Sequence, residues 1–143
     1  SKISESIMSI NAIKGIEFSN AFENSSKLGS QVHDEIGWNG EKYIRYSNNA
    51  GGIEGGISNG EPIVFQAAMK PIPTLIKPLR SVDIISKKEK LAHKERTDSC
   101  AVPAASIIAE SMLCIVITDA LLEKFGGDSL EQLENHIKLS AKF

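Results

Sequence analysis

The spacing of apolar residues divides the chain into an N-terminal part rich in short strands and a C-terminal helical part. Ile3, Ile7 and Met8 recur at helical spacing, which predicts the last turns of an amphipathic helix over residues 1–10. Apolar residues then predict strands within residues 13–18 and 63–69. The polar segment between them favours turns and a short helix.

Two further segments have the pattern of β-hairpins. Asn39-Gly40 stands between short apolar runs, which is a strong hairpin signal and predicts paired strands around it within residues 36–46. Three prolines in residues 70–79 predict an irregular extended segment, because proline cannot donate to a strand ladder. Residues 80–98 then resemble a second hairpin with a charged tip.

The pattern becomes helical after Val102. Pro103 suits a first helical turn, and residues 104–125 predict a long helix that Gly126-Gly127 ends. A last helix is predicted from residue 128 or 129 to about residue 139, with Asp128 or Ser129 as its cap. Strands followed by helices predict an α+β fold.

The most apolar stretch, residues 107–122, is interrupted by Glu110, Ser111 and Asp119. This favours a buried helix of a soluble protein over a membrane span. The chain has the length of one domain, and its formal charge of −2 argues against a nucleic-acid partner. Two cysteines without a disulfide or zinc pattern favour a reduced cytoplasmic protein, with Cys114 filling the core.

Three histidines, His33, His93 and His136, are far apart and form no metal-ligand pattern, so no metal site is predicted.

Five glycines lie within residues 51–60. They do not form a P-loop, because no Gly-Lys-Ser/Thr follows, and they lack the G-x-G-x-x-G spacing of a dinucleotide fold. Two interpretations stay open. The segment is either a connecting loop without a ligand, or a shaped backbone that approaches an anion or a planar ring. Ile53 and Ile57 among the glycines favour packing over disorder.

Two other segments carry possible chemistry. In "AMKPIPT", residues 68–74, Lys70 precedes a rigid Pro-x-Pro bend that could hold a polar heterocycle or a phosphate; the alternative is a plain exit from an edge strand. In "ERTDSCAVPAA", residues 95–105, Arg96 and Asp98 precede a helix N-terminus. They could bind an anion and move a proton, or form a structural ion pair or helix cap.

These segments occur in one order with other specific motifs: "MSINAIKGIEF", "GSQVHDE", "NNAGGIEGGISNGEPI", "KPIPTL" and "ERTDSCAVPAASIIAESML". Together they resemble the C-terminal portion of the chorismate synthase family. The resemblance implies that residues 1–143 are the C-terminal part of a single domain. The family's N-terminal part, which carries its two catalytic histidines, has no counterpart among these residues.

The resemblance implies a lyase that converts 5-enolpyruvylshikimate 3-phosphate to chorismate and phosphate by anti-1,4-elimination, using reduced FMN. This is the last common step of the shikimate pathway, which leads to the aromatic amino acids. Whether the protein reduces its flavin with NADPH or receives reduced FMN is left open. The implied fold layers antiparallel sheets with helices, and the implied assembly is a homotetramer.

The resemblance also assigns residues. Arg96 and Asp98 are expected at the catalytic centre, with Asp98 near the flavin N5, where it assists deprotonation. Two positions depart from the family pattern: Ser99 replaces a frequent proline, and Gln66 replaces a frequent arginine. The implied FMN contacts are Asn11, Ala12, Gly55, Lys70, Pro71, Ile72, Pro73, Thr74 and Arg96.

An alternative function is a truncated, non-catalytic relative that acts as a ligand-binding or subunit-interaction module. This chain alone is expected to be inactive, because the family's catalytic histidines are not among its residues. A cytoplasmic location without nucleic-acid or membrane partners is expected for either function.

Overall fold

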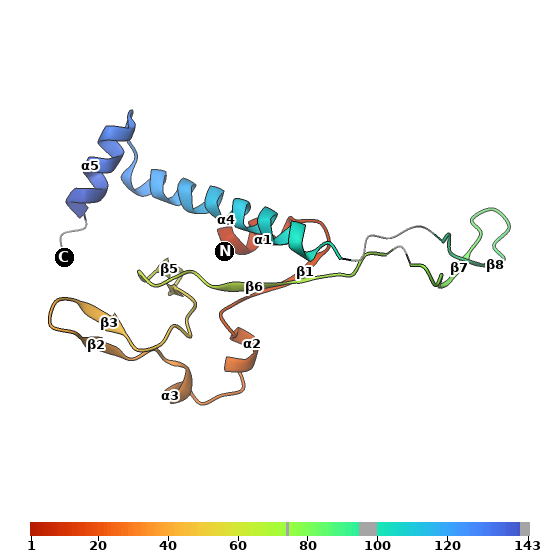
Figure 1. The fold of residues 1–143 in the computed structure, drawn as a ribbon, viewed down its shortest axis with the longest axis horizontal. Helices are drawn as coiled ribbons and strands as arrows, with labels where there is room; N and C mark the ends of the chain where they lie inside the picture. Colours follow the sequence, from red (N-terminus) through yellow and green to blue (C-terminus); the bar gives the residue numbers. More distant parts are fainter. Residues whose placement is uncertain (74, 95–99, 141–143) are drawn as a thin grey trace.

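An antiparallel pair of strands, β1 (Ile13–Phe18) and β6 (Phe65–Met69), forms the centre of the fold. The computed structural model describes residues 1–73, 75–94 and 100–140. Helices α1 (Lys2–Met8) and α4 (Val102–Phe125) lie next to each other along this strand pair (Figure 1). Phe18 pairs with Phe65 at one end of the strands and Ile13 pairs with Met69 at the other.

The core lies between α1, β1 and α4. Ile3, Ile7 and Ile13 are buried, and the side chain of Ile7 is fully enclosed. Phe65 and Met112 are among the half-buried residues that pack around them. The helical spacing of Ile3 and Ile7 therefore predicted both the helix and the face that it buries.

Truncation of Ile7 to alanine is expected to lower the free energy of unfolding by about 2–5 kcal/mol, because the cavity would lie among rigid neighbours on three elements. Urea unfolding followed by circular dichroism measures this loss. The matched control is Ile85→Ala, since the Ile85 side chain is 94% exposed. Equal losses for both variants would contradict the assignment of the core.

The connection from β1 to β6 contains short elements. Helices α2 (Ala21–Asn24) and α3 (Gly29–Val32) come first, and two hairpins follow them. The first hairpin pairs β2 (Ile36–Trp38) with β3 (Tyr43–Arg45), which confirms the prediction from Asn39-Gly40. The Asn39 side-chain oxygen accepts hydrogen bonds from the amides of Glu41 and Lys42 at 3.0 and 2.9 Å. The second hairpin pairs β4 (Ile53–Glu54) with β5 (Ile57–Ser58).

A third hairpin, the second of the two that the sequence predicted, extends from one end of the molecule (Figure 1). It pairs β7 (Arg80–Val82) with β8 (Glu89–Leu91). Its turn is held by Asp83, whose carboxylate accepts hydrogen bonds from the amides of Ile85 and Ser86. The described residues between β6 and β7 form no helix or strand, as the three prolines predicted.

Two glycines end α4 as predicted, and the helix begins at Val102 with Pro103 in its first turn, also as predicted. A Cβ atom at Gly126 would lie 2.6 Å from the Leu122 carbonyl oxygen, so this position requires glycine. The last helix, α5 (Leu130–Ser140), begins after Ser129, whose hydroxyl accepts the Gln132 amide at 3.3 Å. His136 Nδ1 lies 2.7 Å from the Phe125 carbonyl oxygen and ties α5 to the end of α4.

The prediction that α4 is buried is wrong for the described part of the chain. Only 6% of its most apolar window is buried, and Cys114, expected in the core, is exposed. The physical reason is that α1 and the β1–β6 pair cover one side of the helix, while the opposite side has no neighbouring element among the described residues. By length and mean hydropathy alone, α4 could also cross a membrane.

Helices combined with small antiparallel sheets confirm the predicted α+β class.

Candidate functional site

The turn between α1 and β1 meets the end of β6. Ala12 has a φ of +68°, in the left-handed region, and its carbonyl oxygen accepts the Lys70 amide at 2.7 Å. Asn11 is exposed beside it, and Lys70 is exposed at the end of β6. Pro71, Ile72 and Pro73 follow Lys70 directly. The structure therefore brings together six of the nine residues expected to contact FMN: Asn11, Ala12, Lys70, Pro71, Ile72 and Pro73.

The N-terminus of α4 lies at the same corner. A cavity of about 430 Å³ extends from Asn11 along the first turns of α4. Its apolar wall includes Met69, Ile108 and Met112, and Asn11 provides a polar group at its edge. The free backbone amides of a helix N-terminus favour an anion. This corner thus combines an apolar wall, a polar side chain at its edge and a helix N-terminus, and the backbone of Lys70 lies next to it.

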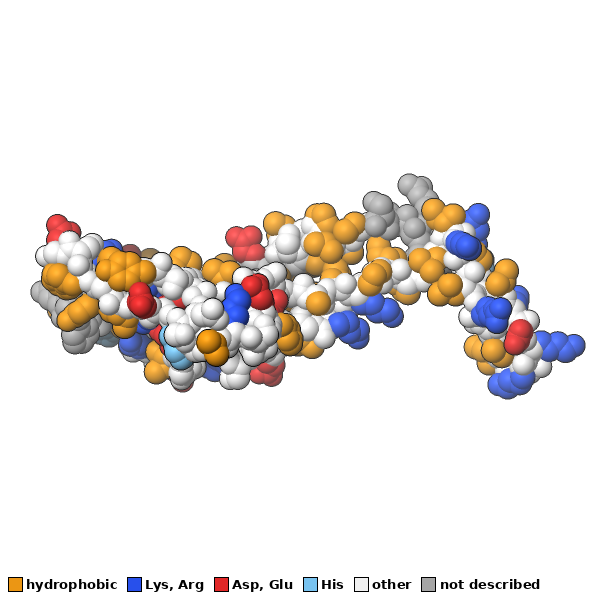
Figure 2. Space-filling model, turned by 90° about the horizontal axis from the view of Figure 1, so that it is seen from below, with side chains coloured by type: hydrophobic (Ala, Val, Ile, Leu, Met, Phe, Trp, Pro, Cys, Tyr) orange, Lys and Arg blue, Asp and Glu red, His pale blue; other side chains and the backbone are white. Residues whose placement is uncertain are grey.

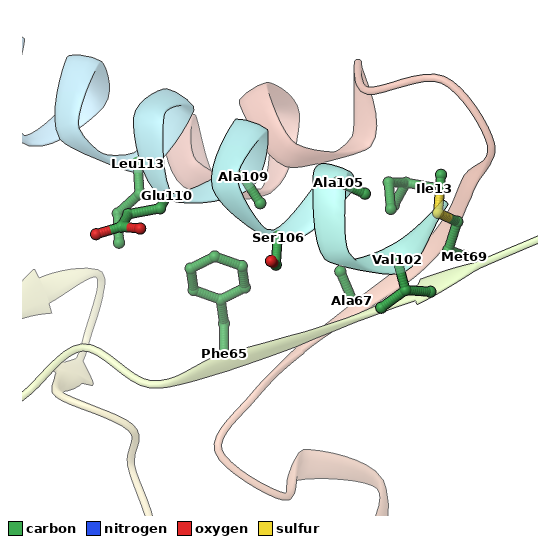
Figure 3. Close-up of a pocket in the computed structure, with 10 residues that line it drawn as sticks. All are labelled: Ile13, Phe65, Ala67, Met69, Val102, Ala105, Ser106, Ala109, Glu110 and Leu113. Carbon is green, nitrogen blue, oxygen red and sulfur yellow. The ribbon is translucent and has the colours of Figure 1, made fainter. Parts of the chain in front are cut away.

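A second cavity lies between β6 and α4 (Figure 3). It has a volume of about 360 Å³, and Phe65, Ala109 and Leu113 contribute to its apolar wall. Met69 lines both cavities, so they adjoin at the end of β6. Glu110 provides the one charged side chain among its described lining residues.

The glycine-rich segment is a shaped backbone and not a loose linker. Gly51 and Gly52 are buried with φ values of +63° and +81°. A Cβ atom at Gly52 would lie 2.5 Å from the Pro62 carbonyl oxygen, and one at Gly51 would lie 2.8 Å from the Val64 carbonyl oxygen. These two glycines therefore serve close backbone packing beside β6.

Gly55 and Gly56 have a different role. They form the turn between β4 and β5, with φ values of +57° and +81°. No described atom lies within 4 Å of a Cβ placed at either position. The turn requires their conformation, and the space beside Gly55 is open. Backbone packing thus accounts for Gly51 and Gly52 without a ligand, whereas the open turn at Gly55 leaves space for one.

Gly55 does not lie with the other expected FMN contacts. The glycine-rich segment meets the chain just before β6 begins, whereas Lys70 follows the end of β6. The length of that strand, about 17 Å at 3.4 Å per residue, separates the two regions. Thr74, Arg96 and Asp98 fall outside the described residues.

Asp34 holds the backbone in front of the glycines, a role that the sequence did not predict. Its carboxylate accepts hydrogen bonds from the Ser47 hydroxyl at 2.5 Å and from the amides of Asn49 and Ala50 at 2.7 and 2.9 Å. Asn48 continues this support, because its side-chain oxygen accepts the Gly52 amide at 2.8 Å. The only available signal was an aspartate within the polar motif "GSQVHDE".

The environment of Asp34 affects its ionisation. Partial burial raises the pKa of its carboxyl group, but the Ser47 hydroxyl, the two backbone amides and the charge of Arg45 together hold that pKa below its ordinary value. Arg45 also forms an ion pair with Glu54 at 2.6 Å, which links β3 to β4. The two hairpins and the glycine-rich segment are thus held by one network of polar contacts.

Substitution of Asp34 by alanine is expected to lower the free energy of unfolding by roughly 1–3 kcal/mol at pH 7, because two backbone amides lose a charged acceptor. Since folding lowers the pKa of Asp34, its contribution is present above the unfolded-state pKa, about 3.9, and is lost as the pH falls through the folded-state value. Urea unfolding at pH 7 and at low pH tests this. An equal difference at both pH values would contradict it; Glu41→Ala, at an exposed turn, is the control.

Comparison with known proteins identifies strong similarity to one family. The family model described as chorismate synthase matches residues 1–122. The chain is 59% identical to the chorismate synthase of Aquifex aeolicus (strain VF5), over 96% of this chain and 36% of that protein. It is 52% identical to the chorismate synthase of Bacillus velezensis, over 100% of this chain and 38% of that protein.

A solved structure gives the same result. The chain matches a crystal structure of chorismate synthase with a TM-score of 0.76 and 46% sequence identity, over 97% of this chain and 34% of that one. The chain therefore spans about a third of the length of the proteins that it matches.

Proposed function

Since this chain belongs to the chorismate synthase family, we propose that the protein containing it is a lyase that converts 5-enolpyruvylshikimate 3-phosphate to chorismate and phosphate with reduced FMN. We further propose that residues 1–143 correspond to the C-terminal part of that enzyme. The observation that carries this proposal is the clustering of Asn11, Ala12 and Lys70 at one corner, beside the N-terminus of α4.

The chemistry of this corner fits a flavin mononucleotide. Met69, Ile108 and Met112 offer an apolar wall suited to a planar ring. Lys70 and the amides at the start of α4 favour negative charge, which suits the cofactor phosphate or an anionic reduced ring. Asn11 can donate and accept hydrogen bonds at the edge of the cavity.

Reduced FMN, when bound, supplies electron density as phosphate leaves the substrate. The residues of this chain perform the supporting tasks. Lys70 binds and orients an anionic group, and Arg96 stabilises negative charge that develops during the elimination. Asp98 would act as the proton acceptor beside the bound cofactor, a role that a carboxylate can fill. A homotetrameric assembly belongs to the same proposal, which leaves open whether the protein reduces its flavin with NADPH or receives reduced FMN.

Binding of reduced FMN to the full-length protein tests the role of this corner. Lys70→Met is expected to raise the dissociation constant about 10- to 100-fold, because a charge-assisted hydrogen bond is lost. Lys14→Met is the matched control, since Lys14 is an exposed lysine of β1. Anaerobic absorbance titration measures both variants. Equal affinities for Lys70→Met and Lys14→Met would contradict the proposed site.

A second candidate function is a non-catalytic module that binds a ligand or a partner chain. The exposed apolar side of α4 favours a contact with another polypeptide segment. A full-length protein that binds neither reduced FMN nor the substrate would support this alternative.

A further inference from the structure

Two Asn-Gly pairs in this chain share one local sequence. Asn39-Gly40 lies at the tip of the β2–β3 hairpin and Asn59-Gly60 follows β5, and a glutamate comes next in both cases. An asparagine side chain reacts readily with the backbone of a following glycine, because glycine has no Cβ atom to hinder the approach. Since the Asn-Gly-Glu sequence is the same at both sites, a large difference in their reactivity has to come from the fold.

The reaction is deamidation, and it requires only water. The backbone nitrogen of the glycine forms a bond to the asparagine Cγ and gives up its proton. The Cγ–Nδ2 bond breaks, and Nδ2 leaves with that proton as ammonia. Water then opens the resulting cyclic imide at either carbonyl. The products are aspartate and isoaspartate, and isoaspartate carries an extra carbon in the backbone.

The two turns are alike at the carboxamide oxygen. Oδ1 of Asn39 accepts the Glu41 amide at 3.0 Å, and Oδ1 of Asn59 accepts the Glu61 amide at 3.0 Å. Both glycines have a positive φ, and no described atom lies within 4 Å of a Cβ placed at either one. Amide donors stabilise the negative charge that develops on Oδ1 when the glycine nitrogen adds to Cγ. Oδ1 of Asn39 has a second such donor, the Lys42 amide at 2.9 Å.

The carboxamide nitrogen of Asn59 is held in place. It donates a hydrogen bond to the Glu54 carboxylate at 2.9 Å, and the same carboxylate oxygen is paired with Arg45. The backbone amide of Asn59 also donates to the Gly52 carbonyl oxygen at 3.1 Å. The Asn59 turn is thus fixed to the packed glycine-rich segment.

The carboxamide nitrogen of Asn39 donates no hydrogen bond within the described part of the chain. Asn39 and Gly40 are exposed, on a hairpin that lies at the lower left in Figure 1 and on the side of the molecule that Figure 2 shows. Among the described residues, β2 and β3 pair only with each other. Such a short two-stranded hairpin opens readily, which lets the backbone reach the geometry of attack.

We propose that Asn39 is a site of spontaneous deamidation in this protein and that the Glu54 carboxylate protects Asn59 from the same reaction. The Asn59 carboxamide has to release a hydrogen bond to a charged group before it reacts, and this raises its barrier. Asn39 has no such bond to break. Isoaspartate at position 39 lengthens the turn and loosens the pairing of β2 with β3. The proposal is independent of the lyase reaction, because its test measures a covalent change and not turnover.

Peptide mapping of the full-length protein after incubation in mildly alkaline buffer tests this proposal. Mass spectrometry measures the conversion of each asparagine to an acid, and enzymatic methylation detects isoaspartate. Asn39 should convert about tenfold or more faster than Asn59, since a hydrogen bond to a charged group contributes about that factor. In urea-unfolded protein the two sites should convert at similar rates, because the contact with Glu54 is lost.

A substitution tests the protecting contact separately. Glu54→Ala should raise the rate at Asn59 about tenfold, whereas Glu54→Gln, which keeps an oxygen acceptor, should raise it less. Glu23→Ala is the matched control, because Glu23 pairs with Lys27 and not with either turn. Circular dichroism checks folding for every variant. A rate at Asn39 no higher than at Asn59 in the folded wild type, or an unchanged rate at Asn59 in the Glu54→Ala variant, would overturn the proposal.

Discussion

Full-length protein with Asp98→Asn is expected to form chorismate about 10²- to 10⁴-fold more slowly than the wild type, the range that one positioned acid or base contributes. An asparagine side chain has nearly the same shape as aspartate but cannot accept the proton. Affinity for reduced FMN should stay nearly unchanged, because binding does not require that transfer. Anaerobic assays of chorismate formation and flavin titration measure the two effects separately.

The matched control for Asp98→Asn is Ser99→Ala, which alters the neighbouring residue without changing charge. Normal turnover by Asp98→Asn would remove Asp98 from the mechanism. Equal loss of turnover and of flavin affinity would instead assign Asp98 to cofactor binding.

The resemblance to the family places Gly55 against FMN, although the structure places it about one strand length from Lys70; on that resemblance, Gly55→Val is expected to abolish measurable binding of reduced FMN. Valine, however, is also strained at a φ of +57°. Gly55→Asn separates the two effects, because asparagine tolerates this conformation in a two-residue hairpin turn while adding a side chain. We expect Gly55→Asn to retain the fold and to weaken FMN binding at least about 100-fold.

Gly60→Asn is the matched control for this substitution. Gly60 also has a positive φ, +88°, and no described atom lies within 4 Å of a Cβ placed there. Full flavin affinity in the Gly55→Asn variant would show that Gly55 serves the turn alone. This outcome is informative because Gly55 lies at the far end of β6 from Lys70.

The sequence predicted the local elements well where one signal was strong. Asn39-Gly40 specified a hairpin, Gly126 ended a helix, and Ile3 and Ile7 identified the buried face of α1. Each of these features depends on backbone conformation or on spacing within a few residues, so the neighbouring sequence determines it.

The sequence could not predict features that depend on distant parts of the chain. The exposure of α4 depends on which elements cover it, and its apolar composition alone suggested burial. Likewise, Asp34 binds amides fifteen and sixteen residues away, so no local pattern marks it. The separation of Gly55 from Lys70 is set by the length of β6 and not by either motif.

The clustering of Asn11 and Ala12 with Lys70 also depends on distant parts of the chain, but the sequence did predict it, through the resemblance to a family. These residues are almost sixty positions apart in sequence, and only the antiparallel register of β1 and β6 brings them together. The resemblance to a family named them as a group, whereas pattern and spacing alone left each segment with a structural alternative.

The most direct test of the central proposal is an anaerobic reaction of the full-length protein with 5-enolpyruvylshikimate 3-phosphate and dithionite-reduced FMN. The proposal predicts that chorismate and phosphate form in equal amounts and that omission of the reductant abolishes both products. Residues 1–143 alone should form neither product under the same conditions. Absence of chorismate with the full-length protein and reduced FMN would contradict the proposed lyase and favour a non-catalytic module.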